Sequence, residues 1–563
     1  MISVSGKHWE EINVSKRLIE KIKSEQNISE LIAKLIISRN FDEIEIYSIN
    51  NEVDLLNPFL NNSDYNECFK TLEEIILNNG KIQIIGDYDV DGIVSTSLII
   101  KFFQFINYPY SFYIPDRFQD GYGANLKLIK KLLVNKIDLV ILLDCGSNSH
   151  ETIEHLNKSK IKTIVIDHHE IYKPYPKTKN IINPKKECQY SNYDYLCSAT
   201  LTYFFIDYFF KKKNIKNSFD INLIYVLLAT IADVMPLRKL NRIISKKILN
   251  NFDITNNYIF NEIYNINNKK KKLNINDLGF LIAPLFNAAG RIDKGEKVVK
   301  LLTSKNKDTQ KKIILNLQKL NERRKLIEEN ILKEVDFNNT KYFKKDVIIL
   351  NLANINEGLI GIVASKLKEY FNKPCIIFTN SGAILKGSAR STENFNIGKF
   401  IKLGIDEGII LNGGGHNLAA GLSIKKNNIE KFDNFINKKF SLYELKTDKK
   451  KYLSKIDLSA VNYSFYKNIE KLEPYGSRNP KPIFLIENLK IIKSSVLKNK
   501  YVTCVIKSSS GKTMNAISFN SIESDIVKIL LNYKNKVSIF AEIYTNFWNN
   551  KKSLQLNILD ITI

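Results

Sequence analysis

Three aspartates occur at every second position between residues 86 and 92, namely Asp87, Asp89 and Asp91. In an extended segment alternate side chains point to the same side, so we expect the three carboxylates to lie together. Their mutual repulsion is unfavourable unless a cation neutralises it, and hard divalent ions such as Mg²⁺ and Mn²⁺ bind carboxylate oxygens. A calcium-binding turn and a solvated acidic turn are the alternatives.

Other acidic and imidazole groups directly follow apolar runs. Asp144 follows one such run, and the pair His168 and His169 follows another. Because open parallel sheets bind ligands at the carboxyl ends of their strands, we expect these groups to meet at one edge. Asp233 follows an apolar helical stretch, where an unpaired buried charge would be costly, so it is a further candidate ligand. Mixed carboxylate and imidazole ligands suit Mn²⁺, and a bridging carboxylate suits two-metal hydrolysis of phosphate esters.

The scaffold for these groups is predicted by the hydrophobic pattern. Between about residues 81 and 165, short apolar runs alternate with longer helical segments. The pattern predicts buried parallel strands at 82–85, 139–143 and 163–166, with a buried crossover helix at 93–106. Short, right-handed connections then give a doubly wound α/β domain. A helical segment over 19–37 precedes it.

The remainder of the chain is predicted to form a helix, a second α/β unit and a barrel. Apolar positions that recur every three, four or seven residues indicate one amphipathic helix between 305 and 337. A smaller α/β unit begins near 341, with strands at 346–350 and 374–378 and a helix at 360–371. After about residue 452, β-rich runs broken by turn residues predict a small β-barrel, with strands at 482–485, 501–507, 536–544 and 553–561.

The composition is that of a globular protein. Of 563 residues, 44% are apolar and 25% are charged, which excludes a disordered or fibrous chain. Lys and Arg exceed Asp and Glu by 84 − 59 = 25, which favours a polyanionic partner such as nucleic acid, with drift in a lysine-rich composition as the alternative. The six cysteines form no C-x-x-C pair, so neither a disulfide framework nor a zinc knuckle is expected. No targeting or membrane-spanning segment is evident, so we expect a cytoplasmic protein.

The metal-site motifs resemble those of the DHH phosphoesterases, whose name is the motif at residues 167–169. Within this family the chain is similar to the RecJ single-strand-specific exonucleases, at IPDRFQDGYG (114–123) and NAAGR (287–291). Downstream, GIVAS (361–365), KGSARS (386–391) and GGHNLAAG (414–421) resemble the DHHA1 domain, and LEPYGSRNP (472–480) resembles the RecJ lead-in to its OB-fold. The resemblance implies an N-terminal helical segment at 1–63, a DHH catalytic domain at 64–304, a connecting helix at 305–340, a DHHA1 substrate-binding domain at 341–445 and an OB-fold-like single-strand-binding domain at 446–563.

The resemblance implies a hydrolase that removes nucleotides from the 5′ end of single-stranded DNA, in DNA repair and recombination, with two Mn²⁺ or Mg²⁺ ions. The metal ligands implied are Asp89, Asp91, Asp144, His168 and Asp233, with Asp144 as the bridge. Asp87 would be an extra ligand or a supporting group. His169 would lie nearest the substrate.

Substrate-binding residues are also implied by the resemblance. Arg117, Ser388 and Arg390 would bind the terminal 5′-phosphate, because a guanidinium group binds phosphate through paired, charge-assisted hydrogen bonds. Arg291 and His416 would contact the phosphate at or next to the cut.

The implied partner is single-stranded DNA, with a helicase and a single-strand-binding protein as further candidates, and the chain would act as a monomer. Tyr122 would stack on a base or pack internally. Two alternatives stay open: a DHH–DHHA1 phosphodiesterase of short oligonucleotides or cyclic dinucleotides, and a non-catalytic scaffold that binds single strands. The predicted barrel and the surplus of positive charge favour the exonuclease.

Overall fold

The chain forms two compact units in a computed structural model. The larger unit comprises residues 56–235 and 248–446, and the smaller comprises residues 1–55, 236–247 and 447–563. Each is described by itself. The structure describes all residues except 118, 122, 134–135, 187–190, 217–218, 270–271, 336, 338–341, 343, 444–448, 499, 533–534 and 549–550. Tyr122 and Cys188 therefore lie outside the described residues, and the other five cysteines are free and buried.

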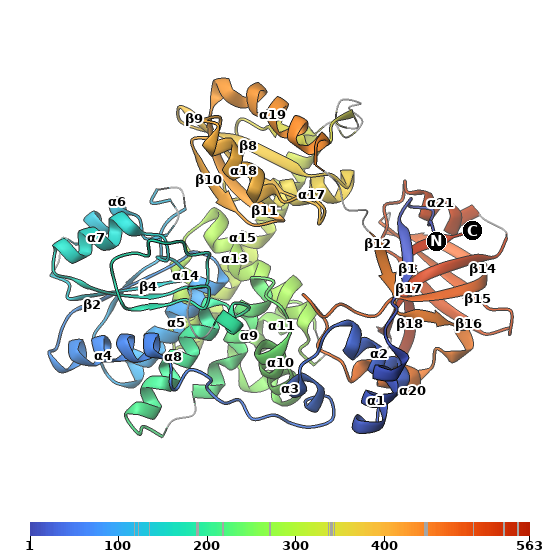
Figure 1. Cartoon of the computed structure of the whole chain (residues 1–563), viewed down its shortest axis with the longest axis horizontal. Coiled ribbons are helices and arrows are strands. Elements are labelled where there is room, and N and C mark those ends of the chain that lie inside the picture. Colours follow the sequence, from blue (N-terminus) through green and yellow to red (C-terminus); the bar gives the residue numbers. More distant parts are fainter. Residues whose placement is uncertain are drawn as a thin grey trace. The chain divides into compact units, whose positions relative to one another are not determined.

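A parallel sheet forms the first part of the larger unit (Figure 1). Its strand order is β3-β2-β4-β5-β6, comprising β2 (Ile82–Gly86), β3 (Ser111–Tyr113), β4 (Leu139–Leu143), β5 (Lys162–Ile166) and β6 (Ile181–Ile182). Every residue of β2 and β4 is buried, because helices cover both faces of the sheet. The predicted strands are thus confirmed to within one residue at each end.

Helices cover both faces of this sheet. Helices α6 (Leu126–Leu132) and α7 (His150–Lys158) pack on one face through a shared apolar cluster. Helices α4 (Ser63–Leu77), α5 (Val90–Phe105) and α8 (Ser198–Lys212) contact the strands from the other face. Helix α5 is buried along nearly its whole length, as its apolar sequence predicted. Its first turn faces the carboxyl edge of the sheet.

Further helices link this sheet to the second sheet of the larger unit. They include α9 (Leu223–Ala232), α10 (Lys239–Asn251, whose residues are divided between the two units), α11 (Tyr258–Ile266), α13 (Ala283–Ile292) and α14 (Glu296–Thr303). The long helix α15 (Lys307–Glu334) follows, as the amphipathic pattern predicted. Within the described residues, no helix is long and apolar enough to cross a membrane.

The second sheet has the order β10-β11-β9-β8-β7 and is antiparallel except for the pair β7 and β8. Its strands are β7 (Ile348–Asn351), β8 (Cys375–Ser381), β9 (Ile384–Arg390), β10 (Asn412–Gly415) and β11 (Ala419–Lys425). One face packs on α17 (Ile360–Phe371) and the end of α15, and the other packs on α18 (Ile397–Asp406) and α19 (Ile429–Ser441). The predicted helix at 360–371 has the observed bounds.

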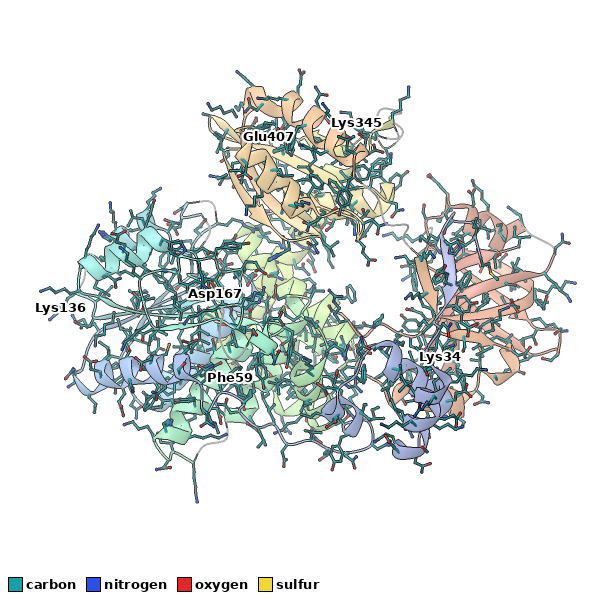
Figure 2. The ribbon with its side chains drawn as sticks, in the orientation of Figure 1. Lys34, Phe59, Lys136, Asp167, Lys345 and Glu407 are labelled. Atoms are coloured by element: carbon teal, nitrogen blue, oxygen red, sulfur yellow. The ribbon has the colours of Figure 1, made fainter. Side chains whose placement is uncertain are left out.

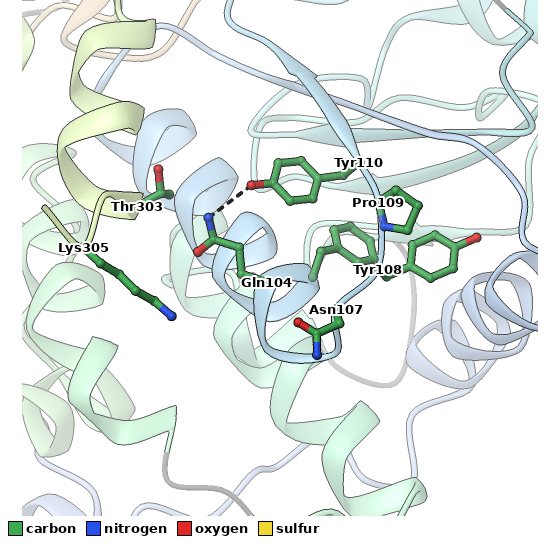
Figure 3. Close-up of a pocket in the computed structure, with 8 residues that line it drawn as sticks. Gln104, Asn107, Tyr108, Pro109, Tyr110, Thr303 and Lys305 are labelled. Atoms are coloured by element: carbon green, nitrogen blue, oxygen red, sulfur yellow. Dashed lines mark hydrogen bonds between the residues drawn. The ribbon is translucent and has the colours of Figure 1, made fainter.

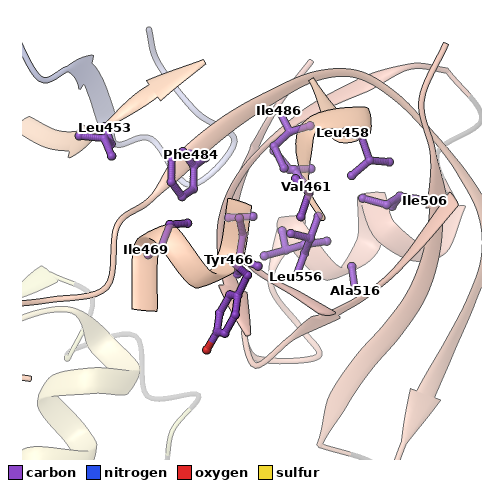
Figure 4. Close-up of a cluster of buried hydrophobic side chains, with 14 of the residues drawn as sticks. Leu453, Leu458, Val461, Tyr466, Ile469, Phe484, Ile486, Ile506, Ala516 and Leu556 are labelled. Atoms are coloured by element: carbon purple, nitrogen blue, oxygen red, sulfur yellow. The ribbon is translucent and has the colours of Figure 1, made fainter. Parts of the chain in front are cut away.

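The smaller unit contains a closed barrel. The strand order is β13-β14-β15-β16-β18-β17, and an additional pairing of β14 with β17 closes it. The strands are β13 (Ser454–Ile456), β14 (Phe484–Leu497), β15 (Tyr501–Lys507), β16 (Thr513–Ser518), β17 (Val537–Trp548) and β18 (Lys551–Thr562). Helices α20 (Tyr463–Glu470) and α21 (Asp525–Asn532) pack against it. Figure 4 shows the apolar core of this barrel, where Ile486, Ile506 and Leu556 point inward from different strands.

Two expectations about this unit were incomplete. The segment predicted as helical over 19–37 forms two helices, α1 (Lys16–Gln26) and α2 (Glu30–Ser38), because Asn27 is left-handed with φ 47° and Ser29 caps the second helix. A strand, β1 (His8–Glu11), precedes them and pairs in parallel with β12 (Lys449–Tyr452). The run predicted at 482–485 covers only the start of β14, because polar residues such as Glu487, Asn488 and Lys490 interrupt the apolar run while the strand continues, mostly exposed, to Leu497.

Asp560 ties the N-terminus to the last strand of the barrel. Its buried carboxylate accepts hydrogen bonds from Ser3 Oγ at 2.7 Å, Ser5 Oγ at 2.6 Å and Trp9 Nε1 at 2.9 Å. Replacing one partner of such a network leaves buried donors without an acceptor.

We therefore expect Asp560→Asn to lower the free energy of unfolding by about 2 kcal/mol, since a charged acceptor is lost from a buried site. Urea denaturation followed by tryptophan fluorescence would measure it. The control is Asp525→Asn on α21, whose carboxylate is 69% exposed. Equal stability of the two variants would contradict the role given to Asp560.

Candidate metal centre and phosphate-binding residues

The first acidic motif lies where β2 ends and α5 begins. Asp89 is the N-cap of α5, and its Oδ1 accepts hydrogen bonds from the backbone N–H groups of Asp91 at 3.0 Å and Gly92 at 3.1 Å. A Cβ at Gly92 would lie 2.5 Å from the carbonyl oxygen of Asp87, so only glycine permits this tight turn. The expectation of an extended segment is therefore wrong, because Asp91 already belongs to the first helical turn.

The carboxylates nevertheless converge, around the Nε2 atom of one histidine. His168 Nε2 lies 3.4 Å from Asp144 Oδ1, 3.5 Å from Asp233 Oδ2 and 3.7 Å from Asp91 Oδ2. Three groups of ligand atoms, each with all members within 4.8 Å of one another, are formed by Asp87, Asp89 and Asp144, by Asp91, His168 and Asp233, and by Asp144, His168 and His169. All seven residues predicted for this site are thus brought together at the carboxyl edge of the sheet.

The backbone is strained beside two of these groups. Asp144 has φ 60°, and Val234, directly after Asp233, has φ 54°. Non-glycine residues rarely adopt this left-handed conformation, and a β-branched residue such as valine adopts it least readily. Such strain is typical of functional sites, where the surrounding structure holds side chains in a fixed place.

Helix α8 supplies support that the sequence analysis missed. The backbone N–H groups of Ser198 and Ala199 donate to the two carboxylate oxygens of Asp91, each at 2.8 Å. Ser198 Oγ donates to Asp144 Oδ1 at 2.9 Å. The partial positive charge of a helix N-terminus stabilises a carboxylate placed there. No helix was predicted here, and the signal available was a serine at the start of the apolar run 198–210.

Asp167 orients the histidines and stands outside the three ligand groups. Its Oδ1 accepts from the backbone N–H of His168 at 2.8 Å and pairs with His169 Nδ1 at 2.8 Å, while Oδ2 accepts from the backbone N–H of Ser147 at 3.0 Å. Figure 2 shows Asp167 inside the sheet region. Burial opposes the charged form of His169, but the hydrogen bond and charge of Asp167 outweigh it and raise the pKa of His169 to about 9. The His169 imidazole therefore carries a proton at neutral pH.

The pKa values of the other ionisable groups at this site favour a bound cation. Burial and the charge of Asp89 raise the pKa of Asp87 to about 8 and that of Asp91 to about 6, and burial raises the pKa of Asp144 and Asp233 well above the ordinary range. Burial lowers the pKa of His168 to about 3, which leaves a neutral imidazole able to bind metal. Asp87 Oδ1 and His168 Nδ1 are buried without a hydrogen-bond partner. This donor set of carboxylate oxygens and a neutral imidazole fits divalent cations.

The predicted phosphate-binding residues lie on several elements of the larger unit. The Arg117 guanidinium lies 4.4 Å from the centre of the Tyr88 ring, and Arg390 Nη1 donates to Ser388 Oγ at 3.1 Å. Arg291 Nη1 donates to the carbonyl oxygen of Gly358 at 3.0 Å. Burial and then nearby guanidinium charges, that of Arg117 first, lower the pKa of Arg291 to about 10. The charge of Arg390 is among those that act on Arg291.

His416 lies in the turn between β10 and β11. Its side chain is 59% exposed, and Nδ1 lies 4.0 Å from Glu170 Oε1, which follows the histidine pair. The residue therefore borders the metal centre from the second sheet without contacting its carboxylates.

An open surface depression of about 620 Å³ lies at the other end of α5 (Figure 3). Gln104, Tyr110 and Lys305 are among its lining residues. Helix α5 has 16 residues, which corresponds to about 24 Å at the usual helical rise. The depression is therefore remote from the metal-binding groups and takes no part in their chemistry.

Metal binding should stabilise the fold most at alkaline pH. In the metal-free protein the raised pKa values of Asp87 and Asp91, about 8 and about 6, mean that the folded state holds protons that the unfolded state has already released. Their contribution to stability is therefore lost as the pH rises through these values, and a divalent cation replaces the lost protons. We expect the rise in Tm caused by Mn²⁺ to be larger at pH 8 than at pH 6.

Differential scanning fluorimetry with Mn²⁺ or a chelator would measure this difference. An Asp144→Ala variant should lose most of the Mn²⁺ effect at both pH values. A Mn²⁺ effect that falls between pH 6 and pH 8 would contradict the assignment.

Three family models match the chain in order. They are the DHH family, N-terminal domain, at residues 81–231, the DHHA1 domain at 344–442 and the RecJ OB domain at 454–560. The predicted series of DHH, DHHA1 and OB-type domains is therefore confirmed, while the exact boundaries stay a prediction.

Known proteins with the same series of domains are similar over most of the chain. The single-stranded-DNA-specific exonuclease RecJ of Bacillus subtilis is 27% identical over 99% of this chain and 71% of its own length. The protein of the same name from Haemophilus influenzae is 28% identical over 84% of this chain and 86% of its own length. The crystal structure of Thermus thermophilus RecJ in complex with Mn²⁺ has a TM-score of 0.83 at 20% identity and matches 99% of this chain and 79% of that chain, which shows a common fold. With its three domains in this order and its DHH motif intact, the chain belongs to the RecJ branch of the DHH family.

Proposed function

We propose that this protein is a 5′→3′ exonuclease that hydrolyses single-stranded DNA to 5′-mononucleotides with two divalent cations, Mn²⁺ or Mg²⁺. The observation that carries the proposal is the convergence of Asp91, Asp144 and Asp233 on His168 Nε2 in a buried site. The names of the relatives support the substrate, since those from several bacteria are called single-stranded-DNA-specific exonucleases.

The metal ligands in this proposal are Asp89, Asp91, Asp144, His168 and Asp233. Asp144 is the bridge, because it belongs to two of the three groups of ligand atoms and its carboxylate, unlike the imidazole of His168, offers two oxygen atoms. Asp87 is an extra ligand or supports Asp89. Two cations held here would supply the Lewis acidity for hydrolysis of a phosphodiester. Protonated His169, fixed by Asp167, presents positive charge beside the anionic substrate.

In this proposal the terminal 5′-phosphate binds in a pocket formed by Arg117, Ser388 and Arg390. This pocket sets the 5′→3′ direction of digestion. Gly361, at the start of α17, keeps this pocket open, because a Cβ there would lie 2.9 Å from Arg390 Nη2 and 3.1 Å from Ser388 Oγ. Arg291 would hold the phosphate at the cut, and exposed His416 would contact the phosphate next to it.

The features of the whole chain favour long single strands over short oligonucleotides or cyclic dinucleotides. The match to the RecJ OB domain and the net charge of +25 support binding of an extended polyanion. The complete set of carboxylates supports catalysis rather than a scaffold role. We also propose that the protein acts as a monomer in the cytoplasm, on strands made available by a helicase and held by a single-strand-binding protein.

Removal of the bridging carboxylate should abolish cleavage while binding persists. We expect Asp144→Ala to lower kcat by at least about 10³, since electrostatic stabilisation of the transition state is lost. Digestion of single- and double-stranded DNA labelled at either end, with Mn²⁺, Mg²⁺ or chelator, would measure activity, polarity and strand preference together. Cleavage of duplex DNA at a similar rate, or full activity of the variant, would refute the proposal.

Arg390 should determine recognition of the 5′ end. We expect Arg390→Met to raise KM for 5′-phosphorylated strands about tenfold while KM for 5′-hydroxyl strands changes little, because a charge-assisted pair of hydrogen bonds is lost. Arg390→Lys is the matched variant, which keeps the charge but not the planar fork. Steady-state kinetics on the two substrates would measure the ratio, and an unchanged ratio would exclude the pocket.

A further inference from the structure

The two-residue strand β6 ends beside the histidine motif. It pairs in parallel with β5, with Ile182 opposite Ile166, so Asn183 follows β6 at the level where Asp167 follows β5. The backbone N–H of Asp167 donates to the carbonyl oxygen of Ile182 at 3.0 Å. The next residue along β6 that could donate to β5 is Pro184, which has no N–H, so the backbone cannot continue this ladder.

The side chain of Asn183 supplies hydrogen bonds where the backbone ladder stops. Its Nδ2 donates to the carbonyl oxygen of His169 at 2.9 Å and to Ser147 Oγ at 2.7 Å. Its Oδ1 accepts from the backbone N–H of Lys185 at 2.9 Å. Both donor hydrogens and the acceptor of the amide are therefore used, and Asn183 is only 2% exposed. The amide is thus held in one orientation against the main chain of His169.

Ser147 completes a closed set of hydrogen bonds around His169. It is buried after β4, and its backbone N–H donates to Asp167 Oδ2 at 3.0 Å. Asp167 Oδ1 in turn pairs with His169 Nδ1 at 2.8 Å. Asn183 therefore fixes the main chain of His169, Asp167 fixes its ring, and Ser147 joins the two. The ends of three neighbouring strands, β4, β5 and β6, contribute one residue each to this support.

A second buried asparagine at the start of β6 offers a direct comparison. Asn180 Nδ2 donates to the carbonyl oxygen of Thr163 at 3.1 Å, and its Oδ1 accepts from Thr71 Oγ1 on α4 at 3.1 Å. These contacts join the sheet to a helix and include none of the metal-binding groups. The two asparagines thus have similar burial and similar bonding, but only the hydrogen bonds of Asn183 reach the histidine motif.

We propose that Asn183 is a positioning residue for phosphodiester hydrolysis, which keeps the imidazole of His169 directed at the substrate. The inference rests on the proposed function, because it takes His169 as the group nearest the substrate. Asn183 acts through the carbonyl oxygen of His169 and through Ser147, and does not itself contact the reacting atoms. Without it the ring bond to Asp167 would have to hold a main chain that has lost its own support.

The test compares the full-length protein with Asn183→Leu, which keeps the shape of the side chain without its polar atoms, and with the matched control Asn180→Leu. The probe is a 5′-phosphorylated oligothymidylate with a 3′-fluorescein label, and kinetics with Mn²⁺ give kcat and KM. A second measurement needs no metal: in chelator, the proton between His169 Nδ1 and Asp167 should give a downfield ¹H NMR signal, assigned by its loss in His169→Gln.

We expect Asn183→Leu to lower kcat about 10- to 100-fold, as loss of a residue that orients a group of a metal site does, and to change KM less than about threefold. The downfield signal should disappear, because the loosened imidazole exchanges its proton with water. Asn180→Leu should lower Tm by a similar amount, yet keep the signal and keep kcat within about twofold, since it too leaves buried groups unpaired but away from His169.

A double-mutant cycle separates positioning from a general loss of structure. In a His169→Gln background, Asn183→Leu should lower kcat less than about threefold further, because the group through which it acts is already gone. Full additivity of the two substitutions, or an equal loss of kcat in Asn180→Leu, would overturn the inference.

Should Asn183→Leu fail to fold, as its Tm would show, Asn183→Ala takes its place with the same expectations, because it removes the same hydrogen bonds and adds no atoms. A retained downfield signal together with a wild-type kcat in the folded variant would also overturn the inference. A wild-type protein that does not cleave the oligothymidylate would refute the proposed function alone, and the NMR comparison in chelator would still decide whether Asn183 positions His169.

Discussion

The central constraint on the larger unit is that several carboxylates lie close together in a buried site. Asp87, Asp91 and Asp144 are all nearly fully buried, and their pKa values are raised because both burial and mutual repulsion oppose ionisation. The fold offsets part of this cost with the N-terminus of α8, which donates two backbone hydrogen bonds to Asp91. Protons or a cation can offset the remainder, and buried Asp87 Oδ1 has no hydrogen-bond partner.

The two sheets of the larger unit supply different groups of side chains. The parallel sheet delivers the metal-binding groups to one edge, because parallel strands all end there with their carboxyl termini. The second sheet delivers Ser388 and Arg390 from β9, opposite the first turn of α17. Helix α15 joins the two and shares a buried carboxylate, Glu328, with α17.

The histidine pair shows how two adjacent residues acquire opposite properties. His168 and His169 differ by one position, yet burial lowers the pKa of the first to about 3 while Asp167 raises that of the second to about 9. These pKa values favour a neutral imidazole at His168 and a protonated one at His169 at neutral pH. The deeper burial of His168 and the pairing of Asp167 Oδ1 with His169 Nδ1 at 2.8 Å together separate their pKa values.

Local sequence determined the elements and the chemistry-bearing residues of this protein. Buried strands and helices appear as apolar runs, so β4 and α17 could be placed with their observed bounds. The motifs marked seven residues that the structure brings together and that could hold metal ions. Tertiary structure alone decided which atoms meet. The support of Asp144 by Ser198, the pairing of β1 with β12 and the contact of Gly361 with Arg390 depend on residues far apart in the chain. Local sequence patterns do not predict such contacts, because packing and charge interactions act between residues that are close in space but distant in the sequence.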